Sequence, residues 1–291
     1  MIRSNGTPLC PICSSSTRFH CTKTTDGHLG TYYHCTNCDT IFLDPMPSAD
    51  VMRDYVNQEY SDGVYASHVR ARPLKETMFA ARSRQIYARQ PGGRLLDVGA
   101  SAGFMVEQAV LGGFDAYGVE LSPVAIEYAA PAIRSRMLVG DANSLAEDGV
   151  EKYDVVTAFD IIEHTYDPAA FAQSLRALLR PGGLLCVTTP DTRHFLRYVM
   201  GSYWPMLEPL QHTVLFSRKS LAALLRQCGF NHIEMRTARK LLTADYLAEQ
   251  VGGLTPGMER AYRIGSPLVP ATLRTRPIWV NIGEIMAFAR A

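Results

Sequence analysis

The sequence predicts an α/β protein whose main domain holds a parallel sheet with helices on both faces. Three observations carry this prediction. Short apolar segments alternate with helical ones from residue 94 to residue 237, as in sheets whose parallel strands are joined by helices. One apolar segment runs directly into a turn that contains Gly99 and Gly103, and another ends in Glu120. In such sheets a ligand binds at the carboxyl ends of the strands.

The expected elements follow from apolar runs, caps and turn signals. Ser122 and Ser217 are expected helix N-caps, and the Pro-Gly-Gly sequences at 91–93 and 181–183 are expected turns. The expected strands are 94–99, 116–121, 137–139, 153–159, 184–189, 232–237 and 282–289. The expected helices are 102–111, one beginning at 123, 168–179 and 218–228.

Composition shifts divide the chain into three parts. Residues 1–47 contain most of the cysteines and form a small module. Residues 48–92 form a helical lid or linker, with helices expected at 49–57 and 73–89. Residues 93–291 form the main domain, which is interrupted before its last strand by a helical, Pro-rich insert at about 240–277. We expect this insert to cover the site at which the second substrate, called the acceptor below, would bind, or to form a homodimer contact.

The composition is that of an ordinary globular enzyme. The chain has 291 residues, with 47% hydrophobic and 20% charged residues and a net charge of +1. This charge predicts no general attraction to nucleic acid or to an anionic membrane surface. The first residues show no signal-peptide core, and no apolar run reaches the ~18 residues that a membrane helix needs. We therefore expect a cytoplasmic location.

Four N-terminal cysteines have the spacing of a structural zinc site. Cys10 and Cys13 form one C-x-x-C pair, and Cys35 and Cys38 form a second pair 21 residues later. Four thiolates close a tetrahedral Zn²⁺ site with no open position, so the predicted metal supports structure and not catalysis. The segment 17–34 between the pairs is expected to form a hairpin.

The glycine turn favours S-adenosylmethionine over a dinucleotide. A dinucleotide site needs G-x-G-x-x-G with the pyrophosphate at a helix N-terminus, whereas here Gly99 and Gly103 are separated by three residues. The acidic Asp97 beside the turn repels phosphate but suits an amino group and a sulfonium. Glu120 ends the next strand, where a carboxylate can accept both ribose hydroxyls.

These motifs resemble, in order and spacing, the class I S-adenosylmethionine-dependent methyltransferases. The resemblance covers about 94–237 and implies a Rossmann-like sheet of seven strands, with the N-terminal module resembling a zinc ribbon. Glu163-His164 and the downstream segment 211–217 look like the branch that contains quinone and small-molecule O-methyltransferases. Ser101 departs from this pattern, because many relatives have glycine there. The matching motifs are 95–99 with Gly103, Glu120, Gly140-Asp141, 159–164 and 179–183.

The resemblance also implies roles for individual residues. Glu120 would bind the ribose, and Leu121 would pack on the adenine. Asp141 would accept from the adenine amino group, and the Ala142 backbone would donate to the ring. Independently of the resemblance, one tyrosine of the lid is expected to contact the methionine end of the cofactor; the candidates are Tyr55, Tyr60 and Tyr65, and Tyr60 is the one chosen. The methionine part would be held by Asp97, Gly99, Ser101 and Gly103, and the sulfonium end would be lined by Phe159 and Asp160.

Methyl transfer to an oxygen requires alignment of the acceptor and removal of its proton. His212 is the favoured general base, and His164 is the second candidate. In an alternative role, Asp160, Glu163 and His164 would hold Mg²⁺ beside a diol.

The sequence thus predicts a methyltransferase of a small molecule, with O-methylation of a hydroxylated sugar or secondary metabolite favoured. N- or C-methylation of a small molecule remains open. A second alternative is an RNA methyltransferase whose zinc module grips RNA, although residues 2–47 contain only Arg3, Arg18 and Lys23 as fixed cations. A third is a silent domain that binds cofactor or partner without catalysis.

Overall fold

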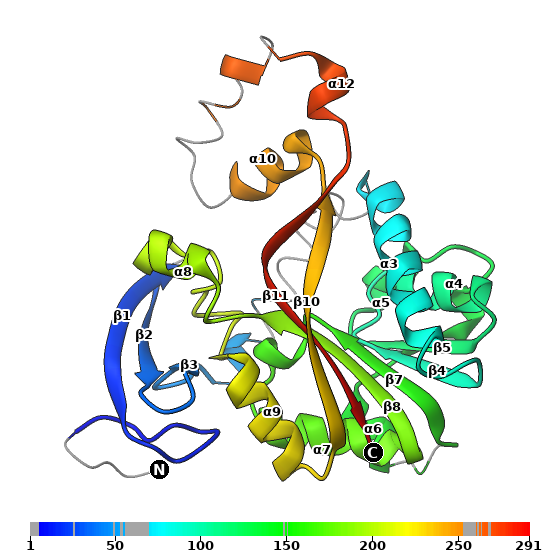
Figure 1. Ribbon diagram of the computed structural model, residues 1–291, viewed down its shortest axis with the longest axis horizontal. Helices are drawn as coiled ribbons and strands as arrows, with labels where there is room; N and C mark the ends of the chain where they lie inside the picture. Colours follow the sequence, from blue (N-terminus) through cyan, green and yellow to red (C-terminus); the bar gives the residue numbers. More distant parts are fainter. Residues whose placement is uncertain are drawn as a thin grey trace.

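A computed structural model describes residues 6–25, 27–48, 50–52, 55, 70–147, 149, 151–252, 260, 262, 264–266 and 269–291. A seven-stranded sheet forms its centre, with strand order β10-β11-β8-β7-β4-β5-β6 (Figure 1). The strands are β4 (Arg94–Val98), β5 (Asp115–Glu120), β6 (Met137–Val139), β7 (Tyr153–Phe159), β8 (Leu179–Pro190), β10 (Asn231–Leu242) and β11 (Ile278–Arg290). The predicted seven-stranded α/β fold is therefore confirmed.

The sheet is mixed, not wholly parallel as the alternation of segments predicted. Strand β11 runs antiparallel to both of its neighbours, β8 and β10, whereas β4, β5, β6, β7 and β8 are parallel. The chain leaves β10 at the edge of the sheet where β11 begins, so the connection through residues 243–277 returns at the same edge and the two strands pair antiparallel. Both strands are longer than expected, and the end of β10 extends into the insert predicted at about 240–277.

Helices cover both faces of the sheet. On one face α3 (Arg72–Tyr87), α4 (Phe104–Leu111) and α5 (Pro123–Glu127) bury a core around Leu95, Val106 and Phe288. On the other face α6 (Ala142–Glu147), α7 (Pro168–Leu178) and α9 (Arg218–Gln227) bury a core around Leu96 and Leu175. The predicted caps are present: Ser122 caps α5, and Ser217 and Ser220 form a capping box on α9.

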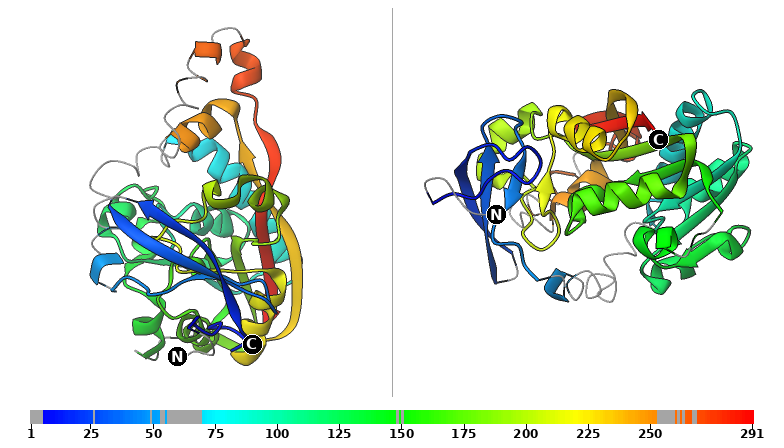
Figure 2. Two further views of the ribbon diagram at one scale, coloured as in Figure 1. Left: turned by 90° about the vertical axis from the view of Figure 1, so that its left-hand side faces the viewer. Right: turned by 90° about the horizontal axis from the view of Figure 1, so that it is seen from below.

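The N-terminal segment forms a second, four-stranded sheet at one end of the molecule (Figures 1 and 2). Strands β1 (Thr17–Thr25) and β2 (His28–Cys35) form the predicted hairpin, and β3 (Ile41–Leu43) pairs with β2. The fourth strand, β9 (Val214–Leu215), comes from the main domain and pairs with β3. Buried residues of the module, among them Cys10, Ile12 and Phe42, belong to the same core as Phe216 and Leu221. The module is thus packed into the main domain.

The remaining helices lie toward the carboxyl edge of the large sheet. Helix α8 (Phe195–Met200) and a 3₁₀ turn, η3 (Gly201–Tyr203), lie beside the N-terminal sheet, and α10 (Ala244–Gly252) and α12 (Ala271–Arg274) extend beyond the hairpin of β10 and β11 (Figure 1). Two further 3₁₀ turns are η1 (Arg134–Arg136) and η2 (Ile162–His164). The helix expected at 49–57 falls mostly outside the described residues. No helix among the described residues has the length and apolarity needed to cross a membrane.

Candidate active site

The turn after β4 is tied to the end of β5 through one carboxylate. Gly99, Ser101 and Gly103 all have left-handed backbones, with φ of 69°, 53° and 71°. Glu120 accepts the backbone N–H groups of Ser101 and Ser122, each at 2.9 Å. A left-handed backbone at a non-glycine residue such as Ser101 destabilises the fold by about 1–2 kcal/mol. A hydrogen bond to a charged group, such as the one from Ser101 to Glu120, stabilises it by a similar amount. Glu120 therefore stabilises the turn after β4. Binding of the ribose hydroxyls by the same carboxylate remains a prediction.

Asp97 lies buried beneath the turn. Its Oδ1 accepts a hydrogen bond from Thr157 Oγ1 at 2.6 Å, across the β4–β7 pair. Burial raises the pKa of Asp97 to about 7, and the hydrogen bond from Thr157 acts in the opposite direction. The group is therefore only partly ionised near neutral pH in the described structure, and a ligand ammonium nearby would favour its charged form.

The residues predicted to hold the adenine follow β5 and β6. Leu121 exposes 68% of its surface directly after Glu120, as expected for a platform that a ligand covers. Asp141 Oδ1 accepts the backbone N–H groups of Asn143 and Ser144 at 2.8 and 3.0 Å, so its observed role is to cap α6. Ala142 is buried at the start of that helix. A contact of Asp141 with adenine remains a prediction.

Phe159 and Asp160 lie where β7 ends. Asp160 has a left-handed backbone, with φ of 57°. Its carboxylate accepts Thr188 Oγ1 at 2.7 Å and pairs with Lys240 Nζ at 3.2 Å. Burial acts to raise the pKa of Asp160, but Lys240 and Arg82 outweigh it and hold this pKa below its usual range. The ionised carboxylate is thus fixed at the expected sulfonium end.

Glu163, His164 and His212 come together at the same edge. The two imidazole rings lie 4.7 Å apart, and ligand atoms of all three residues lie within 4.8 Å of one another. His212 Nδ1 lies 2.8 Å from the carbonyl oxygen of Met206; because a carbonyl only accepts, Nδ1 carries the hydrogen and Nε2 is free of it. Burial lowers the pKa of His164 to about 4 and that of His212 to about 3.

This grouping corrects the predicted magnesium ligands. The set that the sequence offered as an alternative was Asp160, Glu163 and His164, but Asp160 pairs with Lys240 and accepts a hydrogen bond from Thr188 instead. His212, which lies 48 residues after His164 in the sequence, takes its place in the three-residue group. Two imidazoles and one carboxylate suit a transition metal better than Mg²⁺, which prefers oxygen ligands.

Comparison with known proteins settles the family. A model described as a methyltransferase domain matches residues 65–235, which is more than half of the chain. The chain belongs to the S-adenosylmethionine-dependent methyltransferases of class I. A ubiquinone biosynthesis O-methyltransferase of Cereibacter sphaeroides is 33% identical over 175 residues, which cover 56% of this chain and 71% of that protein.

Solved structures show the same fold. A 1,6-didemethyltoxoflavin-N1-methyltransferase of Burkholderia thailandensis superposes with a TM-score of 0.52 and 17% identity, covering 88% of this chain and 97% of that one. A SAM-dependent methyltransferase of Archaeoglobus fulgidus gives a TM-score of 0.50 with 14% identity, over 74% and 94% of the two chains. At these identities the likeness concerns the fold alone.

The four cysteines of the methyltransferase's N-terminal module form one cluster, as their spacing predicted. The Sγ atoms of Cys10 and Cys38, Cys13 and Cys35, and Cys13 and Cys38 lie 3.6, 3.5 and 3.4 Å apart. A tetrahedron with Zn–S bonds of about 2.3 Å has edges of about 3.8 Å, close to these distances. Cys35 Sγ also accepts the backbone N–H groups of Asn37 and Cys38.

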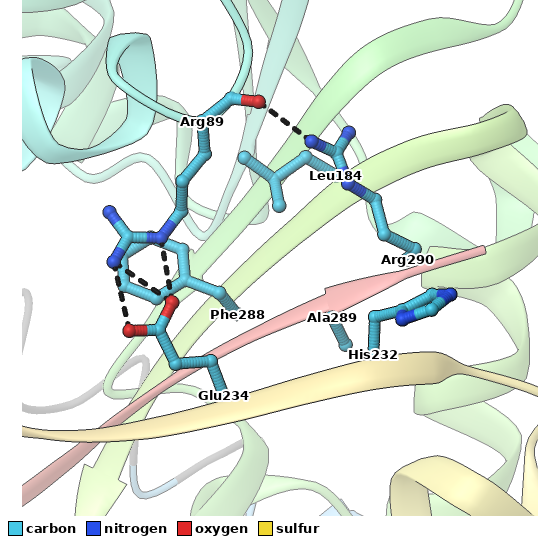
Figure 3. A pocket seen from close by; sticks show the side chains of 7 residues that line it. All are labelled: Arg89, Leu184, His232, Glu234, Phe288, Ala289 and Arg290. Carbon is cyan, nitrogen blue, oxygen red and sulfur yellow. Dashed lines mark hydrogen bonds and ion pairs between the residues drawn. The ribbon is translucent and has the colours of Figure 1, made fainter.

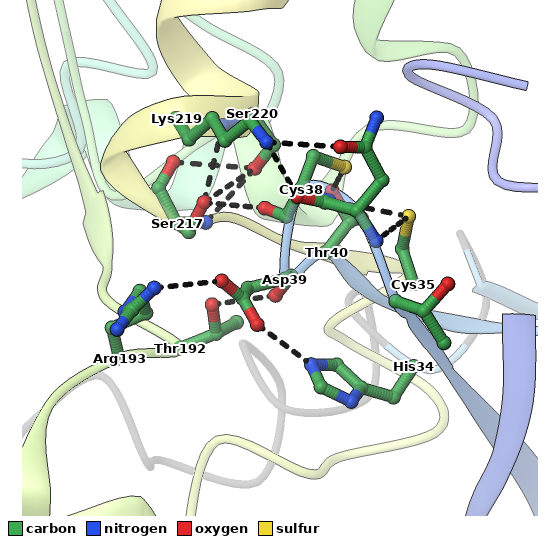
Figure 4. Close-up of polar contacts among 12 residues, drawn as sticks. His34, Cys35, Cys38, Asp39, Thr40, Thr192, Arg193, Ser217, Lys219 and Ser220 are labelled. Atoms are coloured by element: carbon green, nitrogen blue, oxygen red, sulfur yellow. Dashed lines mark hydrogen bonds and ion pairs between the residues drawn. The ribbon is translucent and has the colours of Figure 1, made fainter. Parts of the chain in front are cut away.

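Polar contacts join the loop of the second cysteine pair to the main domain (Figure 4). Ser217, the N-cap of α9, donates to the Cys38 carbonyl at 2.6 Å. Lys219 donates to the backbone and side-chain oxygens of Asn37 at 2.6 and 2.9 Å. Asp39 pairs with Arg193 at 3.0 Å, and its carbonyl accepts Thr192 Oγ1 at 2.7 Å. The cysteine cluster is thereby anchored on residues 192–193 after β8 and on the segment that follows His212.

A small pocket lies at the opposite edge of the sheet from these groups (Figure 3). Its volume is about 150 Å³. Its lining includes Leu184, where the buried part of β8 begins, and Ala289, near the end of the antiparallel β11. Arg89 and Glu234 form an ion pair at 2.9 Å across it. Its position and size exclude it as the cofactor site.

Sequence reasoning missed a buried ionic group near Asp160. Lys240 pairs with both Asp160 and Glu284, and Arg82 lies beside Glu284. One signal was available: Arg82 falls on the buried row of α3 between Met78 and Ile86, at i, i+4 spacing.

Tyr60, the predicted lid residue, lies outside the described residues.

The raised pKa of Asp97 predicts a pH-dependent stability. The folded protein holds this proton more tightly than the unfolded chain, so the free energy of unfolding falls as pH rises from 3.8 to about 7. The interval corresponds to about 4 kcal/mol. Asp97→Asn, which can still accept from Thr157, should lose this part of the pH dependence. Urea unfolding of both proteins without cofactor, at pH 5 and pH 8, measures it. Equal pH dependence in the two proteins would contradict the assignment.

Proposed function

We propose that this methyltransferase transfers the methyl group of S-adenosylmethionine to an oxygen of a small hydroxylated molecule, a sugar or a secondary metabolite. The observation that carries the proposal is the placement of His212 Nε2. Its hydrogen-free nitrogen lies beside His164, at the edge where β7 ends. A neutral imidazole there can accept the hydroxyl proton as oxygen attacks the methyl group in line with the departing sulfur.

Glu163 is a buried carboxyl group next to His212. Its Oε2 has no hydrogen-bond partner among the described residues. Burial, with Asp160 as a second cause, raises the pKa of Glu163 well above its usual value. Glu163 therefore favours its protonated, neutral form, and it leaves His212 with the low basicity that burial imposes.

Contacts within the module favour a small acceptor over RNA. Arg18 is directed to His34, and Lys23 donates to the Ser202 carbonyl. An RNA-gripping module needs a stripe of cations that face solvent, whereas the described part of the module has only two fixed cations, the exposed Arg18 and the half-buried Lys23. The 33% identical relative is itself named an O-methyltransferase, which supports oxygen as the acceptor atom.

A second candidate role follows from the three-residue group. Glu163, His164 and His212 could hold a divalent metal that lowers the pKa of a bound hydroxyl. His212 cannot serve as metal ligand and general base through the same nitrogen. The two candidates therefore predict different responses to a chelator.

A further proposal concerns the four clustered cysteines of the N-terminal module. We infer that Cys10, Cys13, Cys35 and Cys38 bind one Zn²⁺, because their Sγ separations approach those of a tetrahedral site. The ion would fix the loop that contacts Ser217 and Lys219. Its role would be to hold the segment after His212 in place, and not to contact the acceptor.

Glu120 provides the test of the cofactor site. Glu120→Gln replaces one oxygen by an amide that faces backbone N–H donors, so we expect S-adenosylmethionine to bind at least about tenfold more weakly. Isothermal titration calorimetry measures the affinity. Glu107→Gln on α4, which breaks an ion pair with Arg72 of α3, is the matched control and should bind normally. Unchanged affinity in Glu120→Gln would overturn the ribose assignment.

His212 provides the test of the base. His212→Asn keeps a donor for the Met206 carbonyl but removes the acceptor nitrogen, so turnover should fall by about 10²–10⁴-fold while cofactor affinity stays unchanged. Transfer of labelled methyl to a panel of sugars and phenols gives the rates.

The same assay separates base from metal ligand. If His212 is the base, the wild-type rate is unaffected by EDTA under conditions in which elemental analysis shows that the cysteine module keeps its zinc. Loss of the rate in EDTA, with recovery on adding a divalent metal, would favour the metal role. Full activity of His212→Asn would contradict both.

Zinc content tests the module. The purified wild-type chain should contain about one Zn²⁺, and Cys35→Ser should lose it, because three thiolates leave the site open. Cys21→Ser, which changes a cysteine outside the cluster, should retain the metal. Elemental analysis gives the content, and removal of zinc from the wild type should lower its melting temperature. Equal zinc in the two variants would refute the assignment.

A further inference from the structure

Residues 243–282, called the arm below, extend beyond the large sheet without a core of their own. Strand β11 pairs with β8 only from Glu284 onward, so its first residues pair with β10 alone. Helices α10 and α12 continue this two-stranded ribbon away from the sheet (Figure 1). From residue 243 to residue 282 no described residue is buried. A ribbon of two strands is marginally stable in water unless something packs against it.

Polar contacts give the arm a defined shape. The Asp245 carboxylate on α10 accepts the Tyr262 hydroxyl at 2.6 Å and pairs with Arg274 of α12 at 3.0 Å. Large apolar side chains of the arm, in contrast, expose 43–69% of their surface. They are Leu247, Ile264, Val269, Leu273, Ile278 and Trp279. The arm therefore presents an apolar surface that the described part of the chain leaves uncovered.

A second uncovered apolar surface lies on α8 and η3. Helix α8 buries Arg197, and its exposed positions are apolar or aromatic. The exposed side chains, called the α8 face below, show 59–79% of their surface and are Phe195, Tyr198, Val199 and Tyr203. The start of α8 lies against the foot of the arm, where the His194 ring leaves no room for a side chain at residue 283. The α8 face and the arm thus border the same side of the molecule.

The arm and the α8 face together carry enough apolar area for a stable dimer. Taking roughly 100 Å² for each half-exposed large side chain, the ten offer about 1,000 Å² per chain, and a stable interface needs about 800 Å² from each partner. Exposed apolar area on this scale marks an interaction site. The size of the two surfaces therefore indicates that a protein covers them.

Two uncovered surfaces on one chain can cover each other between two copies. In a two-fold dimer, a contact between one surface of the first copy and the other surface of the second occurs twice. Both surfaces of both chains are then covered, whereas an unrelated protein would need two matching surfaces of its own. Within one chain the two surfaces do not meet, because α10 and α12 stand apart from α8 (Figure 1).

We propose that this chain forms a two-fold symmetric dimer in which the arm of each copy packs on the α8 face of the other. Helix α8 lies in the segment that joins the end of β8 to His212. The arm of the other copy would therefore cover the segment that leads to the histidine pair. This effect on the acceptor side rests on the proposed function, whereas the dimer itself does not.

Sedimentation velocity of the full chain, over a range of concentrations, tests the proposal. The wild type should sediment as a dimer of the 32.2 kDa chain. The arm variant carries Leu273→Asp and Trp279→Asp, and the α8 variant carries Tyr198→Asp and Val199→Asp. Each should weaken the dimer at least about tenfold, because carboxylates are costly to bury in an apolar contact. A monomeric wild type would overturn the proposal.

A matched control and a folding check complete this experiment. Leu111→Asp changes an exposed leucine at the end of α4, outside both surfaces, and should dimerise as the wild type does. Circular dichroism shows whether each variant is folded. Trp279→Asp and Val199→Asp provide the test if a double variant is not.

Mixing the two double variants shows which surfaces meet. A heterodimer of the arm variant with the α8 variant keeps one of the two reciprocal contacts intact. The mixture should therefore form dimers at a concentration at which each variant alone is monomeric. If the arm met the other copy's arm instead, mixing would restore nothing. Absence of dimers in the mixture, or an α8 variant that dimerises as the wild type does, would overturn the proposal.

The rival occupant is an anionic membrane surface, since Arg260 and Arg276 are exposed on the arm. Vesicles of phosphatidylcholine, with and without phosphatidylserine, separate the two. We expect the wild type to remain in the supernatant as a dimer. A monomeric wild type that sediments with the phosphatidylserine vesicles would assign the arm to a lipid surface and overturn the proposal.

Discussion

The common direction of five neighbouring strands is the constraint on which the candidate site depends. Because β4, β5, β6, β7 and β8 are parallel, their carboxyl ends meet at one edge. Residues far apart in the sequence, such as Glu120 and Asp160, are thereby brought to the same edge. The Glu120 carboxylate then joins two of these ends by accepting Ser101 and Ser122. The antiparallel β11 adds Glu284 from inside a strand, which a wholly parallel sheet would not supply.

The N-terminal module extends this edge. Its sheet is completed by β9, the two-residue strand that follows His212 and Thr213. Tyr32 on β2 donates to the His212 carbonyl at 3.4 Å, and Ser217 donates to Cys38. The segment 212–217 thus lies between the cysteine cluster and the histidine pair. A Zn²⁺ bound by the four cysteines, as proposed, would act on the histidine pair through this segment without contacting the acceptor.

Sequence patterns predicted local features well and long-range ionic contacts poorly. The strands, the caps at Ser122 and Ser217 and the grouping of four cysteines each depend on neighbouring residues or on short spacings, so they could be inferred. The presence of His212 in place of Asp160 in the three-residue group could not be inferred from the sequence. It depends on how the loop after β8 returns to the end of β7. Arg82 and Glu284 were missed for a similar reason: each is a charge inside an apolar pattern, and its partner comes from another element.

The most direct test of the account is a crystal structure with bound S-adenosylhomocysteine. We predict that the ribose hydroxyls bind Glu120, that the adenine lies beside Leu121, and that the sulfur is directed toward the space between Asp160 and His212. Density for the ligand at another edge of the sheet, or a sulfur directed away from His212, would contradict it.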